Sequence, residues 1–373
     1  MSSKIRKKDP CPCGSGKRYK DCCFKTFKAK KYSNVEISPK KDETPTKGVP
    51  LKGKPLIGRL GIIRSKQRLK ENKDLLEKLS KELRKLDLGM DFKELLMKAW
   101  DSKRLRKMST QEIINTLESM NIHFDEGQFK TQAKNYISAI QLAEDYYYTQ
   151  DFTAEELEED FIWLAIVELW KRFIPEQYTV ELIDYAIQDG HDYIEQQNYT
   201  DGLKEWESAW NMVKAIVPPE ITSMEEADMF IPEPLTDYLS NWCQDFEEEL
   251  HNGGLEDKVW VKKRIDYTRE FYERFAEASD LIIENMLRAE AESYAALGDM
   301  EKADNLFEAL TKKFPDSVWV YIGWGDIYWR SKDVPDYEKA EKVYRLGLDH
   351  CTVEINEIYE RLEYIEEEKR RNY

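Results

Sequence analysis

The sequence has 373 residues but no long hydrophobic run, only four histidines and no glycine-rich phosphate loop that follows a strand pattern. Its longest near-apolar stretch, Phe161 to Trp170, is interrupted by Glu168, whereas a membrane span needs about 18 apolar residues. No hydrophobic segment follows the basic N-terminus, so we expect no signal peptide. The histidines lack metal-ligand spacing and have no nucleophile motif nearby. These absences predict a soluble, cytoplasmic protein that is not an enzyme.

Cysteine is scarce outside one short run. Cys243 and Cys351 lie far apart on helical patterns and are expected to be packed thiols. The other four cysteines fall within thirteen residues, at Cys11, Cys13, Cys22 and Cys23. A structural zinc ion takes four soft ligands in a tetrahedron, so four neighbouring thiolates predict one closed metal site. The alternatives are a disulfide pair or unrelated reactive thiols, although adjacent cysteines make poor mutual disulfide partners.

The run from Asp9 to Cys23 resembles the SEC-C motif, the zinc-binding tail found on the translocase motor SecA and on many small bacterial proteins. That family has Cys-Pro-Cys-Gly-Ser-Gly-Lys, then a Tyr-Lys pair, then Cys followed by His or Cys, and this chain has every element. Cys23 stands where SecA tails carry histidine. The resemblance covers about the first 25 residues. It implies a zinc ion held by the four cysteines and docking on partner proteins or ribosomes rather than catalysis, and it leaves open whether iron can replace zinc.

Charge is distributed unevenly along the chain. Residues 1–70 contain 21 Lys and Arg against five Asp and Glu, whereas the remainder contains 36 against 68. A basic arm joined to an acidic body predicts an arm that seeks polyanions, nucleic acid included, or an arm that folds back on its own body. Residues 26–70 are rich in Lys, Pro, Ser, Thr and Gly, so we expect a disordered linker between a zinc knuckle at 1–25 and the body.

From Glu71 onward the sequence has no convincing strand pattern, only apolar residues at helical spacing. Apolar stripes at 75–86 and 163–170 predict core faces of helices. Three capping boxes predict helix N-termini, because each supplies partners for exposed amide groups. They begin at Ser109, Thr153 and Thr222. The body is therefore expected to be all helical, with domains at 71–176 and 177–373.

Internal similarity narrows the architecture further. Tyr294 and Tyr328 are 34 residues apart, and small and aromatic residues recur at matching offsets. The residues that carry the pattern are Gly190, Tyr193, Gly202, Trp206, Ala209, Ala303, Phe307, Pro315, Tyr321, Trp324, Gly325, Ala340, Tyr344 and Gly347. They resemble degenerate tetratricopeptide repeats over about 180–216 and 284–350, and Asn252 to Gly254 predict a turn between helices. The expected fold is all-α: a tetratricopeptide-like helical repeat body with a small N-terminal zinc knuckle on a disordered basic tether. A plain helical bundle is the alternative.

Two functions fit this organisation. In the first, the protein is an adaptor whose zinc knuckle docks on a ribosome or chaperone while the helical repeats hold a second protein. Its contact candidates are cationic or aromatic: Lys17, Arg18, Tyr19 and Lys20 at the knuckle, and Trp319, Trp329 and Tyr337 outside the repeat pattern. The alternative is a nucleic-acid-binding regulator that uses the basic arm at 1–70. A hydrolase whose site is invisible in the sequence is the third and weakest interpretation.

Overall fold

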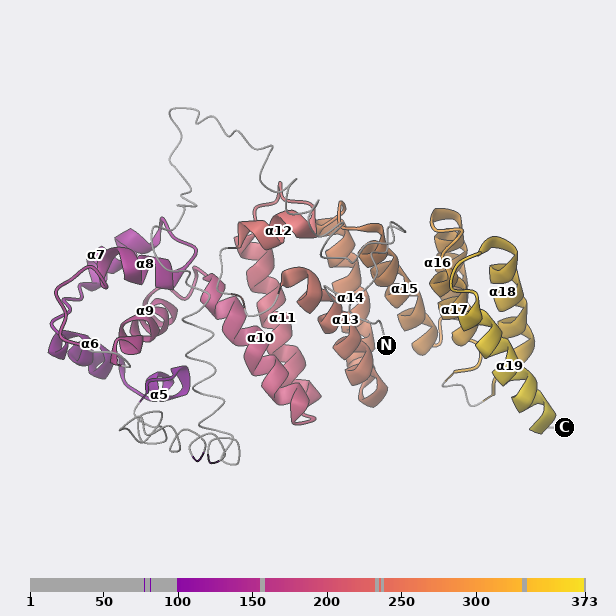
Figure 1. Cartoon of the computed structure of the whole chain (residues 1–373), viewed down its shortest axis with the longest axis horizontal. Helices are drawn as coiled ribbons and strands as arrows, with labels where there is room; N and C mark the ends of the chain where they lie inside the picture. The colour runs from indigo at the N-terminus through magenta and orange to yellow at the C-terminus, as the bar shows by residue number, and fades with distance from the viewer. Residues whose placement is uncertain are drawn as a thin grey trace. The chain divides into compact units, whose positions relative to one another are not determined.

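The computed structural model describes residues 77, 81, 99–154, 158–231, 235, 238–330 and 334–371. Fifteen helices, α5 to α19, make up its regular secondary structure, and the described residues contain no strand (Figure 1). The all-α prediction is confirmed. The bounds are α5 Ser102–Arg106, α6 Thr110–Ser119, α7 Glu126–Ala133, α8 Ala139–Tyr146, α9 Asp160–Phe173, α10 Val180–Glu195, α11 Tyr199–Ile216, α12 Met224–Phe230, α13 Leu239–Glu256, α14 Lys258–Arg274, α15 Asp280–Ala296, α16 Met300–Lys313, α17 Val318–Asp326, α18 Tyr337–His350 and α19 Asn356–Arg371.

Helices α5 to α9 share one hydrophobic core, in which α5, α6 and α8 all contact α9. Ten of the fourteen residues of α9 are buried, including Trp163 and Trp170, so the core stripe predicted at 163–170 is confirmed. None of the described helices is both long enough and apolar enough to cross a membrane. The predicted leucine stripe at 75–86 lies outside the described residues, apart from positions 77 and 81.

The three predicted capping boxes have different outcomes. At α6 the Ser109 hydroxyl accepts from the Glu112 N–H at 3.2 Å and the Glu112 carboxylate accepts from the Ser109 N–H at 2.6 Å, which confirms that box. The box predicted at Thr153 includes residues outside the described part, which lacks 155–157. Thr153 itself is not helical, and α9 begins only at Asp160. The third prediction is wrong by one residue. Ser223 rather than Thr222 caps α12, because the Thr222 carbonyl instead accepts from the Glu277 N–H at 2.9 Å.

Eight of the ten remaining helices form four antiparallel pairs, α10 with α11, α13 with α14, α15 with α16, and α17 with α18, and the short helix α12 packs on α13. Each second helix also contacts the first helix of the following pair, and α18 contacts α19 in the same way. First helices contact one another in sequence from α13 through α15 and α17 to α19. Such nearest-neighbour packing is typical of helical repeat proteins. The pair α13/α14 fills the gap between the two repeat segments found in the sequence.

Small residues facing aromatic rings hold two of these pairs together. A Cβ atom built on Gly190 of α10 would lie 2.2 Å from the ring of Trp206, and one on Gly325 of α17 would lie 2.1 Å from the ring of Tyr344. Trp206 and Tyr344 are almost completely buried, as is Phe307 at the corresponding position of α16. The offsets noted in the sequence therefore mark residues that pack between paired helices.

The turn predicted at Asn252 to Gly254 is wrong, because α13 continues through these residues to Glu256. Both glycines serve close packing instead. A Cβ atom on Gly253 would lie 2.6 Å from a methyl carbon of Leu203, and one on Gly254 would lie 2.8 Å from a methyl carbon of Val261. The chain turns at Asp257, which ends α13 and caps α14.

A buried glutamate joins the first group of helices to the pairs. Glu181 of α10 is fully buried, and its carboxylate accepts from the Ser138 hydroxyl and from the N–H groups of Ala139 and Ile140 at 2.9 and 3.2 Å. These donors lie at the N-terminus of α8, where unpaired amide groups favour an anion. Burial nevertheless raises the pKa of Glu181 above its ordinary value.

The described part of the chain ends in a charged helix, α19. Helix α19 buries Ile358, Leu362 and Ile365 against α17 and α18. Its exposed residues include Glu360 and Glu363, so the helix covers the last pair with an acidic outer surface.

Candidate functional site

The residues predicted for the zinc knuckle lie outside the described part of the chain. They are Cys11, Cys13, Cys22 and Cys23 as ligands and Lys17, Arg18, Tyr19 and Lys20 as contacts. The predicted linker at 26–70 also lies outside it. Among the described residues, no group of three or more His, Cys, Asp or Glu side chains is arranged to hold a metal ion. The two cysteines that the structure describes, Cys243 and Cys351, are both buried free thiols, as expected.

The three aromatic contact candidates of the body all border the C-terminal core. Trp319, Trp329 and Tyr337 are half-buried and pack against the cluster formed by α15 to α19. The Trp319 indole N–H donates to a Glu354 carboxylate oxygen at 3.0 Å. The Trp329 ring centroid lies 5.0 Å from that of Tyr364 on α19. These side chains already have partners within the protein, and part of each remains exposed.

Trp329 belongs to a polar network between α17, α18 and α19. Its indole N–H donates to the Tyr344 hydroxyl at 2.7 Å, and that hydroxyl donates to Asp326. The Asp326 carboxylate also lies 3.4 Å from the Arg361 guanidinium. Burial raises the pKa of Asp326, although Tyr344 and Arg361 oppose the shift. The network fixes the orientation of Trp329, so this ring presents a defined surface.

Tyr321, Trp324 and Tyr328 occupy repeat positions, where aromatic residues usually serve internal packing. Tyr321 and Tyr328 are buried. Trp324 is half-buried, and its indole N–H donates to Asp304 at 2.8 Å, as the Tyr328 hydroxyl also does. These three aromatic side chains therefore serve mainly the internal packing of the helix pairs.

A second candidate surface is a groove between α11 and α14 that sequence analysis missed. We call it the α11/α14 groove; its cavity volume is about 380 Å³. Two ion pairs cross it, Lys263 with Glu207 and Lys214 with Glu270. The two cross-groove pairs have the same sequence offset, so α11 and α14 run parallel, with one pair two turns beyond the other.

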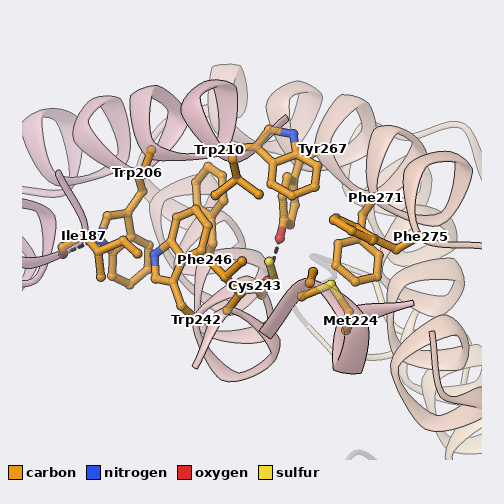
Figure 2. Close-up of a cluster of buried hydrophobic side chains, with 14 of the residues drawn as sticks. Ile187, Trp206, Trp210, Met224, Trp242, Cys243, Phe246, Tyr267, Phe271 and Phe275 are labelled. Atoms are coloured by element: carbon orange, nitrogen blue, oxygen red, sulfur yellow. Dashed lines mark hydrogen bonds between the residues drawn. The ribbon is translucent and has the colours of Figure 1, made fainter. Parts of the chain in front are cut away.

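Aromatic side chains lie beneath these ion pairs. The groove is lined by Trp210, Phe246, Trp260 and Tyr267, all of which are largely buried. Three of these belong to the aromatic cluster in Figure 2, where Trp206, Trp242 and Phe246 lie together and Tyr267 donates to the Cys243 carbonyl oxygen at 2.7 Å. Trp210 and Tyr267 make an edge contact at 5.1 Å between centroids. The aromatic floor of the groove is therefore part of the hydrophobic core of the body.

The basic side chains of the groove have acidic partners. Glu270 accepts from Lys214 and, at 2.8 Å, from the Trp210 indole N–H. Partial burial acts in the opposite direction, but these two donors lower the pKa of Glu270. Arg269 pairs with Glu290 at 2.7 Å, and Lys263 with Glu207.

Two acidic side chains of the groove lack a basic partner among the described residues. Asp266 and Glu273 are exposed and form no ion pair with any residue that the structure describes. Because they lie seven residues apart on α14, they project from similar sides of the helix. The groove therefore combines an aromatic floor with uncompensated negative charge.

The spacing of Glu207 with Lys214 and of Lys263 with Glu270 is visible in the sequence, but many charged pairs in this chain have helical spacing. Only the parallel placement of α11 and α14 brings these particular charges together.

Residues 8–25 match the family model of the SEC-C motif. The SecA protein translocase subunit of Azobacteroides pseudotrichonymphae genomovar. CFP2 is 75% identical over 20 residues, which amount to 5% of this chain and 2% of that subunit. The chain thus spans a very small part of the length of this relative. No solved structure matches significantly. The chain therefore carries a SEC-C motif, a motif type associated with zinc and with protein interaction. No family match covers the helix pairs, so their tetratricopeptide resemblance stays a prediction.

Proposed function

We propose that this protein is a zinc-binding adaptor whose SEC-C motif docks on one partner while the helical body holds a second protein. The SEC-C match at residues 8–25 carries the proposal, because this segment contains all four predicted ligands. Four cysteine thiolates suit zinc, which prefers tetrahedral coordination by sulfur and nitrogen ligands. A ribosome or an acidic chaperone is the partner that we propose for the knuckle, with Lys17, Arg18, Tyr19 and Lys20 making the contacts.

The body contributes binding rather than turnover in this proposal. Tetratricopeptide-like pairs offer an extended surface for protein segments, and Trp319, Trp329 and Tyr337 are its aromatic contact candidates. A cytoplasmic setting belongs to the same proposal, because the knuckle needs reduced cysteines and reducing compartments maintain them. Short segments bury too little apolar surface to fold alone, so zinc supplies the folding free energy of the knuckle.

Metal analysis and quantitative pull-downs test the adaptor function. The full chain should contain stoichiometric zinc, and a Cys22→Ser, Cys23→Ser variant should lose both the metal and the partner of the knuckle. A chelator should have the same effect on binding while the circular dichroism of the helical body stays unchanged. Absence of bound metal, or loss of body helicity on chelation, would contradict the proposal.

The basic arm favours a second candidate, a nucleic-acid-binding regulator. Residues 1–70 carry 21 basic and five acidic side chains, enough to neutralise several phosphates. Nuclease treatment separates the two candidates. Partners of an adaptor remain bound after nuclease, whereas partners held through nucleic acid are released.

A further inference from the structure

We propose that the α11/α14 groove binds a lysine- or arginine-bearing extended segment of a partner protein. This inference rests on the proposed role of the body as the holder of a second protein, and it names the chemistry of that protein. It does not depend on zinc or on the knuckle.

The charges of the groove select a basic segment. Lys214, Lys263 and Arg269 each have a carboxylate partner, so they offer little to an anionic ligand. Asp266 and Glu273 are exposed and form no ion pair within the described part of the chain, so they offer negative charge to a cationic ligand. Beyond residue 70 the chain has 68 acidic and 36 basic residues, and a field of this sign attracts basic partners.

The floor of the groove suits the same side chains. Lysine and arginine have apolar stems that pack on aromatic surface while their charged ends remain near water and carboxylates. Trp210, Trp260 and Tyr267 line the floor and are largely buried, so a ligand meets only their exposed parts. A cation near an aromatic face gains further attraction. Lys214 of the protein itself is an example of a cation beside both an aromatic ring and a carboxylate. Its ammonium nitrogen lies 5.7 Å from the Trp210 ring centroid and pairs with Glu270.

The size of the groove limits its ligand to a few side chains. Its volume of about 380 Å³ is at the lower end of the range for small-ligand pockets. An extended segment would therefore insert one or two basic side chains between the ion pairs, and the rest of the segment would follow the surface of α14. Such a contact is of modest affinity and sensitive to salt.

Fluorescence polarisation with the full chain tests the proposal. The probe is a fluorescein-labelled peptide in which lysine alternates with glycine, and the comparison peptide carries glutamate in place of lysine. The lysine peptide should bind, and the glutamate peptide should not. The Asp266→Asn, Glu273→Gln variant should raise the Kd for the lysine peptide by about fivefold or more, the change expected from two charge contacts. Both positions are exposed, so the variant should keep its helicity.

A matched variant controls for the total charge of the body. Glu360→Gln, Glu363→Gln on α19 removes the same charge from two exposed residues that form no ion pair in the described part of the chain. Its Kd should change by less than about twofold. Equal losses in the two variants would mean that diffuse negative charge binds the peptide, and would overturn the proposal. Equal binding of the two peptides would overturn it as well.

Carbodiimide cross-linking distinguishes a partner segment from the chain's own basic arm. The reagent joins a carboxylate to an amine, so mass spectrometry should find Asp266 or Glu273 joined to the added peptide. Cross-links from these residues to lysines of residues 1–70 that persist in excess peptide would identify the arm as the occupant and contradict the proposal. The Cys22→Ser, Cys23→Ser variant should bind the peptide as the unsubstituted chain does, so failure of the knuckle proposal and failure of this one give different results.

Discussion

The aromatic side chains of α10 to α14 and those of α17 and α18 differ in how their polar atoms are satisfied. In the first region, Trp206 and Tyr267 donate to main-chain carbonyl groups, and Trp210 donates to the exposed carboxylate of Glu270. The buried Trp242 indole nitrogen has no hydrogen-bond partner among the residues that the structure describes. In the second region, Trp329 and Tyr344 form a chain of hydrogen bonds that ends on the carboxylate of Asp326. The second region therefore depends on a largely buried ionisable group, Asp326, whereas the ionisable group that Trp210 contacts in the first region is exposed. The two regions should respond differently to truncation and to pH.

The largest expected effect comes from removing a central ring of the first region. Trp206→Ala should lower the free energy of unfolding by about 3–5 kcal/mol, because it deletes a buried side chain and leaves a cavity beside Gly190. Urea denaturation measures the change. The half-buried Trp319→Ala is the comparison from the second region and should cost about 1–2 kcal/mol. Equal losses would contradict the contrast between the regions.

Removing one hydroxyl from each region compares their hydrogen bonds directly. Tyr344→Phe should lower the free energy of unfolding by about 1–3 kcal/mol, because Trp329 loses an acceptor and Asp326 loses a donor. Tyr267→Phe removes a single hydrogen bond, to the Cys243 carbonyl, and should cost about 0.5–1.5 kcal/mol. If the Tyr267 variant were the less stable of the two, the polar network would not be the distinguishing feature of the second region.

The free energy of unfolding should vary with pH through Asp326 of the second region. Burial raises the pKa of Asp326 in the folded protein above its pKa in the unfolded chain. At a pH between these two pKa values, the folded chain therefore binds more protons than the unfolded chain. The contribution of Asp326 to the free energy of unfolding therefore falls as the pH rises above the ordinary value of 3.8. Asp326→Asn does not titrate. The free energy of unfolding of this variant, minus that of the unsubstituted chain, should increase between about pH 4 and about pH 7. A constant or decreasing difference would contradict the shift.

The smallest expected effect concerns the ion pairs above the aromatic cluster. Lys263→Ala should change the free energy of unfolding by at most about 1 kcal/mol, because both partners are partly exposed and salt screens their attraction. Thermal melts at low and high salt measure the change. A much larger loss would mean that the ion pairs, and not the rings, hold α11 to α14.

Sequence patterns were sufficient for several local features, although the capping residue of α12 was placed one residue too early. Helical periodicity and the Ser109 capping box were predicted correctly. The error at Asn252 to Gly254 has a physical cause. Paired glycines are frequent in turns, but here they allow α13 to approach Leu203 and Val261. This requirement comes from neighbouring helices and is not encoded locally.

One of the two candidate sites could be found from local sequence, and the other could not. The SEC-C motif is a local pattern, because a zinc ion needs ligands that a short segment can supply, and the sequence alone identified it. The α11/α14 groove required the structure, because its lining residues come from three helices separated along the chain. Sequence by itself determined the helical class, the SEC-C motif and the contrast between basic arm and acidic body. Tertiary structure decided that α13 and α14 complete the series of pairs and that α11 and α14 run parallel, because such choices depend on side-chain packing between distant segments.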